Sequence, residues 1–154
     1  LFGMPYVTTR KPRPYDTTLL NYNWQVWGVK AYSIYAGQTH NVSHTTSEQS
    51  IEAILRFMQK NGIISYRSTR AGYESEVFDE EELINISAHK AGIFDFCKTA
   101  GEHVKAGEIL ARILDPFDCG VKEEVKAPVD GTIFFVTNSP LVLEHTLIYR
   151  LRED

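Results

Sequence analysis

The C-terminal half of the chain carries nearly the same pattern twice. Ile86–Phe94 (ISAHKAGIF) resembles Val125–Phe134 (VKAPVDGTIF), and Val104–Ile113 then resembles Val142–Leu151. Each copy contains short strands with apolar residues at every second position, separated by glycine turns. One copy could not bury its own apolar face. We therefore predict an all-β, barrel-sandwich hybrid-like domain with internal duplication, in which the two copies pair about a pseudo-twofold axis.

Two details of the repeat lead to further expectations. Gly92 and Gly131 hold the same place in the two copies, so we expect them to occupy equivalent turns. Lys122 lies between the copies, where biotinyl and lipoyl carrier domains present a modified lysine. Its neighbours Val121 and Glu123 are not those of a carrier lysine, so we expect Lys122 to bear no prosthetic group.

Composition restricts the classes of function. The 154 residues suffice for one domain or two small ones, and no apolar run approaches the roughly 18 residues of a membrane span. A formal charge of −4 argues against nucleic acid as a partner. Cys97 and Cys119 are interpreted as ordinary thiols of a cytoplasmic protein.

The first residue is Leu1, so we expect the chain to be part of something longer. The basic cluster Arg10–Arg13 reads as a solvated loop, with an anion site as the alternative.

The N-terminal half predicts an α/β layer. A loosely patterned helix is expected over 17–27, followed by a buried strand at Val29–Tyr35. A clearer helix follows, with Thr45 and Glu48 as a capping box and Asn61-Gly62 as its end. Its expected apolar face consists of Ile51, Ile54, Leu55 and Met58.

The polar stretch 67–72 separates these patterns from the β-rich remainder. We place an α/β domain at 1–66, a linker at 67–72 and the duplicated β domain at 73–154.

No metal-binding pattern is assigned within the chain. His40 and His44 lie four residues apart, a spacing that could pair two imidazoles on one helical face, but they precede the expected helix and also read as loop residues. The other histidines, His89, His103 and His145, are scattered over the β half without a recurring carboxylate, and are interpreted as structural or surface residues.

The whole chain resembles the C-terminal half of the succinylglutamate desuccinylase and aspartoacylase family, zinc hydrolases with a carboxypeptidase-like fold. Gly28–Gly37 is similar to a late strand of that fold, and the helix ending at Asn61–Ile64 follows as expected. Ala91–Phe94, Gly101–Leu110 and Lys126–Gly131 resemble the appended β domain of bacterial members.

The resemblance implies zinc in the full-length parent, held by a His-x-x-Glu pair and a later His that lie upstream of this region. It also aligns Tyr35 with the glutamate that serves the family as general base. A phenol is protonated at neutral pH and does not accept a proton as a carboxylate does. Tyr35 is therefore the one candidate catalytic position, and Glu48 is the nearest downstream carboxylate, although its capping role is the stronger interpretation.

From this resemblance we expect the parent to hydrolyse an amide bond of an N-acyl amino acid or a similar small molecule. The alternative is a non-catalytic homologue whose β domain serves oligomerisation or partner binding. Substrate identity and oligomeric state, including a homo-oligomer, stay open.

Overall fold

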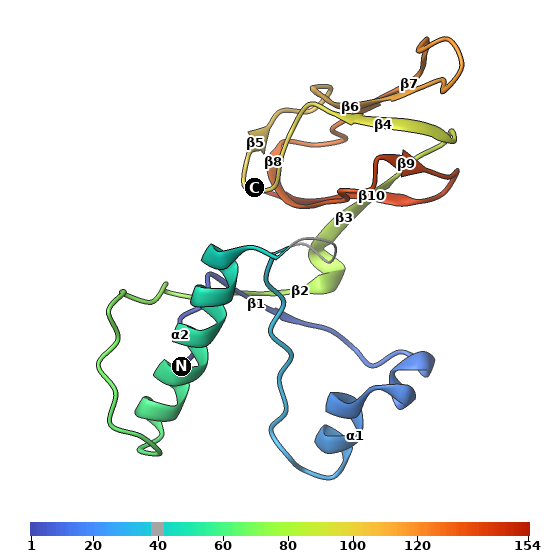
Figure 1. Cartoon of the computed structure of the whole chain (residues 1–154). Helices are drawn as coiled ribbons and strands as arrows, with labels where there is room; N and C mark the ends of the chain where they lie inside the picture. The colour runs from blue at the N-terminus through green and yellow to red at the C-terminus, as the bar shows by residue number, and fades with distance from the viewer. Residues whose placement is uncertain (38–41) are drawn as a thin grey trace. The chain divides into compact units, whose positions relative to one another are not determined.

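The computed structural model describes residues 1–37 and 42–154 and divides into two compact units, Leu1–Asp79 and Glu80–Asp154 (Figure 1). The division falls C-terminal to the predicted linker at 67–72. Strand β2 (Glu76–Asp79) pairs in parallel with β1 (Tyr6–Thr9) and so belongs to the first unit. Residues that the sequence pattern assigned to the β domain are thus tied to the N-terminus by backbone hydrogen bonds.

The first unit contains two α-helices and a short 3₁₀ helix besides this strand pair. The 3₁₀ helix η1 spans Pro14–Thr18, α1 spans Leu20–Val26, and α2 spans His44–Lys60. Helix α1 lies inside the range predicted from the sequence. It is shorter than predicted because the preceding residues form η1 instead.

Helix α2 begins earlier than the predicted capping box. Ser43 is its N-cap, and the Ser43 hydroxyl accepts a hydrogen bond from the amide of Thr46 at 3.4 Å. The predicted box of Thr45 and Glu48 is therefore wrong. The end of the helix is as predicted, with Asn61 as C-cap and Gly62 in the left-handed region at φ +70°.

The predicted apolar stripe of α2 is covered only in part, because Leu55 and Met58 are half-buried while its two isoleucines are exposed. Ile51 is 57% and Ile54 is 45% exposed, whereas Ala53 and Arg56 are buried. Other segments reach α2 through both apolar and polar contacts: the ring of Phe57 stacks on that of Phe2 with centroids 4.4 Å apart, and Arg56 donates to the Phe2 carbonyl.

The predicted strand at Val29–Tyr35 is extended backbone without a sheet partner among the described residues. Its Ala31 is buried, and the Ala31 carbonyl accepts a hydrogen bond from the side chain of Gln25 at 2.7 Å. An extended segment becomes a strand only when a neighbouring strand pairs with its amides and carbonyls. The prediction of a buried strand is therefore wrong for the described residues: no strand pairs with this segment, and Val29, Tyr32 and Tyr35 are exposed.

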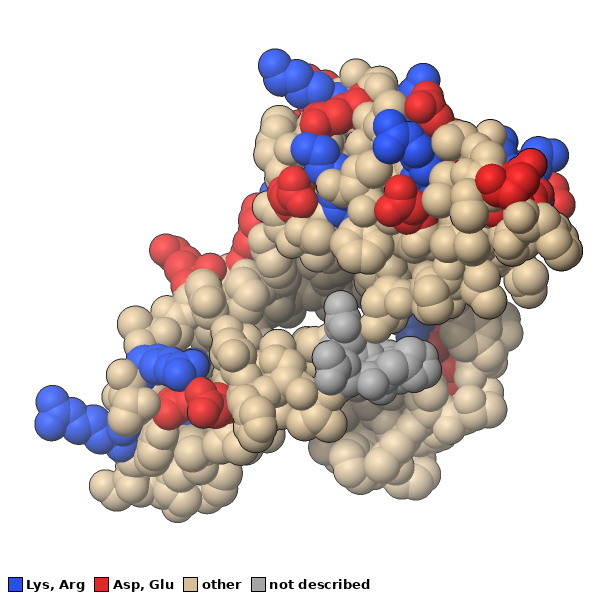
Figure 2. Space-filling model, turned by 45° about the horizontal axis from the view of Figure 1, so that its top comes forward, with Lys and Arg blue, Asp and Glu red and all other residues tan. Residues whose placement is uncertain are grey.

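Apolar side chains are distributed very unequally over the two units. Of the 17 buried apolar residues in the described part of the chain, only Ala31, Ala53 and Phe78 belong to the first unit. Of the 25 large apolar residues that are exposed there, 19 belong to the first unit, including Trp24 and Trp27. Figure 2 shows mixed acidic and basic side chains over the second unit and few charges on the visible face of the first. The first unit does not bury a core of its own.

The second unit consists of two four-stranded antiparallel sheets. Their orders are β3-β10-β8-β5 and β7-β6-β4-β9. The strands of the first predicted copy are β3 (Leu83–Ser87), β4 (Gly92–Phe96), β5 (His103–Val104) and β6 (Ile109–Leu114). Those of the second are β7 (Val121–Lys126), β8 (Gly131–Val136), β9 (Leu141–Val142) and β10 (Leu147–Glu153), and a short 3₁₀ helix, η2 (Glu80–Glu82), precedes β3.

The strands of the two copies interleave. Each sheet takes two strands from each copy, and one sheet order becomes the other when every strand is exchanged for its counterpart, β3 for β7 and so on to β6 for β10. The regular structure of the described residues is therefore mostly β-sheet with two α-helices, and neither predicted copy could form its sheets without the other.

One apolar cluster fills the space between the two sheets. Its members come from both copies and include Val104, Leu110, Ile113, Ile133, Val142, Ile148 and Leu151. Tyr149 is also buried there, and its hydroxyl donates to the carbonyl of Leu110 at 2.8 Å and to that of Lys98 at 3.0 Å. Loss of solvent around this phenol raises the pKa of Tyr149. No helix in the described part of the chain is long and apolar enough to cross a membrane.

Two glycines allow strand starts to approach strand ends. Gly92 begins β4, and a Cβ there would lie 2.3 Å from the carbonyl oxygen of Leu114 at the end of β6. Gly131 begins β8, and a Cβ there would lie 2.1 Å from the carbonyl oxygen of Arg152 in β10. Both contacts are too short for any side chain, so the backbone itself requires glycine at these positions.

We expect Gly131→Ala to lower the free energy of unfolding of the second unit by about 1–3 kcal/mol, because the methyl group forces β8 away from β10. Urea denaturation followed by circular dichroism measures this. Gly120→Ala is the matched control, since its Cβ would meet only the side chain of Asp118, at 3.0 Å. Equal unfolding midpoints for Gly131→Ala and the unmodified chain would contradict the packing described.

Candidate active site

The first unit contains a pocket of about 290 Å³. Four segments form its wall: the N-terminal residues 3–5, the extended residues 35–37, the first turns of α2, and residues 70–73. The lining residues are Gly3, Met4, Pro5, Tyr35, Ala36, Gly37, Thr46, Gln49, Glu52, Arg56, Arg70, Ala71 and Tyr73. The volume lies at the lower limit for ligand sites and suits a small molecule.

Tyr35, the candidate catalytic residue from the sequence, lines this pocket and is 86% exposed. Two residues later, Gly37 has φ +73°, and a Cβ there would lie 2.8 Å from the hydroxyl oxygen of Thr46. The glycine therefore lets the chain turn closely over the first turn of α2. This turn places the Tyr35 segment beside the helix.

Glu52 is the acidic residue of the pocket wall. Its carboxylate accepts hydrogen bonds from the hydroxyls of Tyr66 at 2.7 Å, Ser68 at 2.8 Å and Thr69 at 3.1 Å. The hydrogen bond from Tyr66 is the largest of the effects that lower the pKa of Glu52, and the same bond raises the pKa of Tyr66. A carboxylate held in this way is a weak proton acceptor. Glu52 thus anchors the 66–69 segment to α2.

Arg56 lies one turn further along α2 and is only 8% exposed. Its guanidinium donates to the carbonyl oxygens of Phe2 at 2.7 Å and Arg70 at 3.0 Å. Gly3 and Gly72 flank it so closely that a Cβ at Gly3 would lie 2.6 Å from the Arg56 Nη1 atom. One buried cation therefore joins the N-terminal segment and the 68–72 segment to the helix.

Arg70 and Glu48 form an exposed ion pair at the pocket. The Arg70 Nη2 atom lies 3.0 Å from the Glu48 carboxylate, and both side chains are more than half exposed. Glu48 therefore has neither the capping role predicted for it nor a place among the pocket-lining residues. Arg70 lines the pocket, and its backbone is held by Arg56.

Among the described residues, the pocket lining offers hydrogen-bond donors and no efficient general base. Arg70 and the exposed Tyr35 can donate, while Glu52 is engaged by three hydroxyl groups. This arrangement can bind and polarise a small molecule, but proton abstraction needs a further group. Glu52, Arg56 and Arg70 were missed by sequence reasoning, although the i, i+4 spacing of Glu52 and Arg56 on a predicted helix was a visible signal.

The histidines do not assemble a metal centre among the residues described. His40 lies outside the described residues, and His44 is the first residue of α2. His89 contacts Glu123, and His103 contacts Asp154, both on the surface of the second unit. No group of three or more His, Cys, Asp or Glu side chains in the described ranges could hold a metal ion. A catalytic zinc needs about three such ligands, so the described donor set does not fit one.

Lys122 lies within strand β7, and its ammonium is 3.6 Å from the carboxylate of Asp115. The turn between β6 and β7 is formed by residues 115–120. Lys122 is thus set back from the tip of this hairpin. The absence of a prosthetic group stays a prediction. Cys97 and Cys119 are both exposed and form no disulfide.

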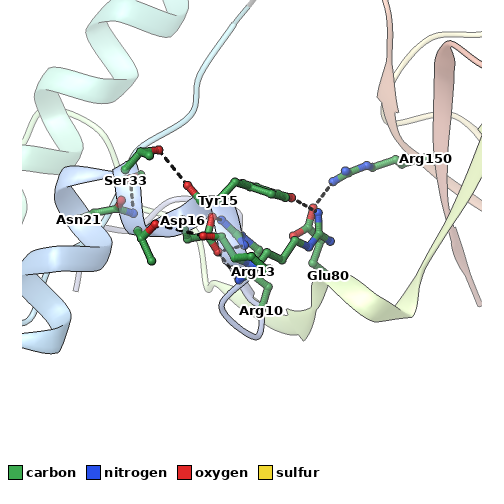
Figure 3. Close-up of polar contacts among 11 residues, drawn as sticks. Arg10, Arg13, Tyr15, Asp16, Asn21, Ser33, Glu80 and Arg150 are labelled. Atoms are coloured by element: carbon green, nitrogen blue, oxygen red, sulfur yellow. Dashed lines mark hydrogen bonds and ion pairs between the residues drawn. The ribbon is translucent and has the colours of Figure 1, made fainter.

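A second polar cluster shows that Arg10–Arg13 is not simply a solvated loop (Figure 3). Asp16 is 2% exposed and accepts two hydrogen bonds of 2.6 Å from the Arg10 guanidinium and one of 2.6 Å from the backbone amide of Arg13. The Arg10 side chain is the main cause that lowers the pKa of Asp16 to about 2. Figure 3 also shows the Asn21–Ser33 hydrogen bond, which holds the extended segment to α1, and the Arg150–Glu80 pair of the second unit.

Neither a protein-family model nor a curated protein matches this sequence. Solved structures do match. A succinylglutamate desuccinylase/aspartoacylase from Rhodobacter sphaeroides is 19% identical over 99% of this chain and 46% of its own, with a TM-score of 0.77. The product-bound ectoine utilization protein EutE (DoeB) from Ruegeria pomeroyi is 14% identical over 97% of this chain and 45% of its own, with a TM-score of 0.79. An aspartoacylase family protein from Mesorhizobium loti is 10% identical over 97% of this chain and 44% of its own, with a TM-score of 0.67.

The chain spans about half the length of these solved structures. At such low identity the likeness establishes a shared fold. Two of these three neighbours carry the family name that the sequence motifs indicated, so the predicted resemblance is confirmed at the level of the fold.

We expect Arg56→Met to release the 66–72 segment from α2, because it removes the buried cation that holds the Arg70 carbonyl. Trypsin cleavage after Arg67 and Arg70 then accelerates by about tenfold or more, since hydrogen bonds of a charged group stabilise a structure by roughly 1.5–3 kcal/mol. Lys60→Met is the control, because it also removes a positive charge and a cleavage site from α2. Equal cleavage rates in the two variants would contradict the anchoring role of Arg56.

Acid should weaken the same attachment through Glu52. Its pKa is lowered in the folded state, so its contribution is present above the ordinary value near 4.5 and is lost as the pH falls below it. We expect the hydrogen-exchange protection of the Tyr73 amide, which donates to the Gly3 carbonyl at 3.0 Å at the end of this segment, to fall between pH 6 and pH 3. In Glu52→Gln this protection is reduced already at pH 6 and changes less with pH. Glu48→Gln, at an exposed position, is expected to behave as the unmodified chain does.

Proposed function

We propose that this chain is the C-terminal portion of a zinc-dependent hydrolase that resembles succinylglutamate desuccinylases and aspartoacylases. The parent cleaves an amide bond of an N-acyl amino acid or a similar small molecule in the cytoplasm. The observation that carries the proposal is the match of at least 97% of this chain to about half of several such proteins.

The uncovered apolar surface of the first unit supports this proposal. Burial of a large apolar side chain stabilises a protein by about 1.5–3 kcal/mol. The described part of the first unit exposes 19 such residues, a larger apolar surface than a stable domain leaves in contact with water. The parallel pair β1 and β2 points the same way, because parallel strands normally lie inside larger sheets that are covered on both faces. The remaining half of a carboxypeptidase-like domain would supply both the missing strands and the cover.

The described residues hold no set of zinc ligands, so we propose that the ligands belong to polypeptide outside this chain. Bound zinc would supply Lewis acidity to such a hydrolysis. The part played by this chain is then to shape the substrate side of the pocket.

Tyr35 is proposed as a hydrogen-bond donor in that pocket. It aligns with the family's glutamate but bears a phenol, which donates a proton in a hydrogen bond at neutral pH. A donor aimed at a developing oxyanion stabilises a transition state without accepting a proton. This role is compatible with its exposed position in the pocket wall.

For the second unit we propose an internal duplication with a barrel-sandwich hybrid-like architecture. The support is the exchange symmetry of the two sheet orders and the matching positions of Gly92 and Gly131 against the ends of β6 and β10.

The second candidate is a non-catalytic homologue whose β unit serves oligomerisation or partner binding. Two observations favour it: the phenol at the general-base position, and the engagement of Glu52 by three hydroxyls. The sequence upstream of this region in the parent distinguishes the candidates, since the hydrolase requires a His-x-x-Glu pair and a later His.

Substitutions of Tyr35 in the full-length parent test the catalytic role. We expect Tyr35→Phe to lower turnover of N-acyl amino acids by about tenfold to a hundredfold with little loss of stability, because only a hydroxyl is removed. Tyr35→Glu introduces a carboxylate and is expected to raise turnover if the general base is all that the site lacks, and to lower it if the phenol serves as the donor. Steady-state assays with a range of N-acyl amino acids measure both. Unchanged turnover in both variants, with the fold intact, would favour the non-catalytic homologue.

The uncovered surface generates a separate expectation. This chain alone is expected to bind a dye for exposed apolar surface, such as ANS, far more strongly than the full-length parent does. The isolated second unit, residues 80–154, serves as the reference for a region with its own core. Equally weak dye binding by the chain and the parent would contradict the proposal that further polypeptide covers the first unit.

A further inference from the structure

We infer that the outer face of the sheet β7-β6-β4-β9 binds the same face of a second copy of this chain, about a twofold axis that runs parallel to the strands between β6 and β4. This contact lies in the second unit and is independent of the proposed function, because it suits a hydrolase and a non-catalytic homologue alike.

An apolar row crosses the outer face of this sheet. Its members are directly paired from strand to strand: Val121, Leu114, Ile93 and Leu141. Directly paired residues share one face of a sheet, and successive residues of a strand point to opposite faces. Ile113 and Phe94, which adjoin two members of the row, belong to the buried core. The row therefore faces away from the core, and Val121 at 55% and Leu141 at 63% exposure are open to solvent.

The other sheet shows that the fold does not require this row. Exchange of each strand for its counterpart leads to a second row of directly paired residues: Leu83, Arg152, Thr132 and His103. Leu83 is only 6% exposed, and the other three positions hold polar residues. Two sheets of corresponding strand order thus carry an apolar row on one outer face and a mostly polar row on the other. An apolar row that is not needed for folding and lies in water is typical of an interaction surface.

A charged row lies beside the apolar row on the same face. Asp95 is directly paired with Arg112, and Arg112 with Glu124. Arg112 and Asp95 are each two residues from a member of the apolar row, so they share its face. The Arg112 Nε atom lies 3.8 Å from the Glu124 carboxylate, and both side chains are 41% exposed. Such an exposed pair is weak, so Arg112 is available to a carboxylate of another molecule.

The face is complementary to itself about one axis. The strand order β7-β6-β4-β9 has its centre between β6 and β4, so a twofold axis there exchanges β6 with β4 and β7 with β9. When two copies meet face to face about this axis, the apolar row of one lies on the apolar row of the other. Arg112 of each copy then lies opposite Asp95 of the second copy, which gives two ion pairs. A match of both apolar and charged rows selects a second copy as the occupant.

The contact is small. Strands in a sheet lie about 4.8 Å apart, so a face of four strands is about 19 Å wide. A contact of this width buries less than the roughly 800 Å² per partner of a standard interface. Phe117, which is 96% exposed in the turn between β6 and β7, enlarges the apolar area at one end. We therefore expect a weak dimer, with a dissociation constant of about 10–500 µM.

Sedimentation equilibrium of the complete 154-residue chain over a range of concentrations measures this association. Arg112→Glu and Asp95→Arg each place like charges opposite one another across the axis, and each is expected to weaken dimerisation by about tenfold or more. Lys105→Glu is the matched control, because it makes the same change of charge at an exposed position that follows β5 in the other sheet. It is expected to change the dissociation constant by less than about twofold.

A mixture of the two charge-reversal variants tests the axis itself. In a mixed dimer the introduced glutamate faces the introduced arginine, and the original Asp95 faces the original Arg112. We expect the mixed dimer to form about tenfold more tightly than either variant dimerises alone. Within a single chain each variant has like charges at two paired positions, and mixing cannot repair that. A gain on mixing therefore cannot come from a change in folding.

Three outcomes would overturn the inference. A chain that stays monomeric throughout the concentration range would assign the apolar row to a different protein. Equal association of the unmodified chain, Arg112→Glu and Lys105→Glu would assign self-association to the uncovered surface of the first unit. No gain on mixing would exclude the proposed axis. None of these outcomes bears on zinc or hydrolysis, which are tested in the parent by the Tyr35 variants.

Discussion

The second unit depends on one constraint: an apolar sheet face must be covered, and here strands β3–β6 and strands β7–β10 cover each other. Each sheet contains two strands from β3–β6 and two from β7–β10. Neither set of strands can therefore form a complete sheet without the other. The core between the sheets then excludes water around Tyr149, Ile133 and Leu110. The same packing of strands requires Gly92 at the start of β4 and Gly131 at the start of β8, because neighbouring backbone lies too close there for a side chain.

The same constraint applies to the first unit, whose described residues do not cover their own apolar surface. Many of its large apolar residues are exposed, and a few aromatic contacts, such as the stack of Phe2 on Phe57, act together with polar contacts to hold it. Glu52 and Arg56, one turn apart on α2, attach the N-terminal and 66–72 segments to the helix through hydroxyls and carbonyls. The pocket exists because these two side chains position its walls. The stability of this unit and the shape of its pocket are therefore linked through the same residues.

The candidate site was only partly accessible from the sequence. Tyr35 was found because an apolar strand pattern ending in Ala36-Gly37 resembles a known one, and it does line the pocket. Arg70 was not found, since it lies in a polar stretch that reads as a linker. Its place in the pocket wall depends on a carbonyl held by a buried arginine, and no local pattern predicts such a contact. Glu48 was assigned to a cap because its spacing fits one, whereas Ser43 begins the helix two positions before the expected cap.

The sequence by itself determined the repeat, the strand-rich second half, helix α2 with its glycine stop, and the resemblance to a hydrolase fold. These follow from periodicity and turn chemistry, which are local properties. Tertiary structure alone decided how the copies interleave, that β2 pairs with β1 and so moves the boundary to Asp79, and that the isoleucines of the α2 stripe are exposed while Arg56 is buried. The physical reason is that burial and pairing depend on which segments meet in space. An apolar stripe in a sequence indicates a face that needs cover, but it does not say whether the same chain provides it.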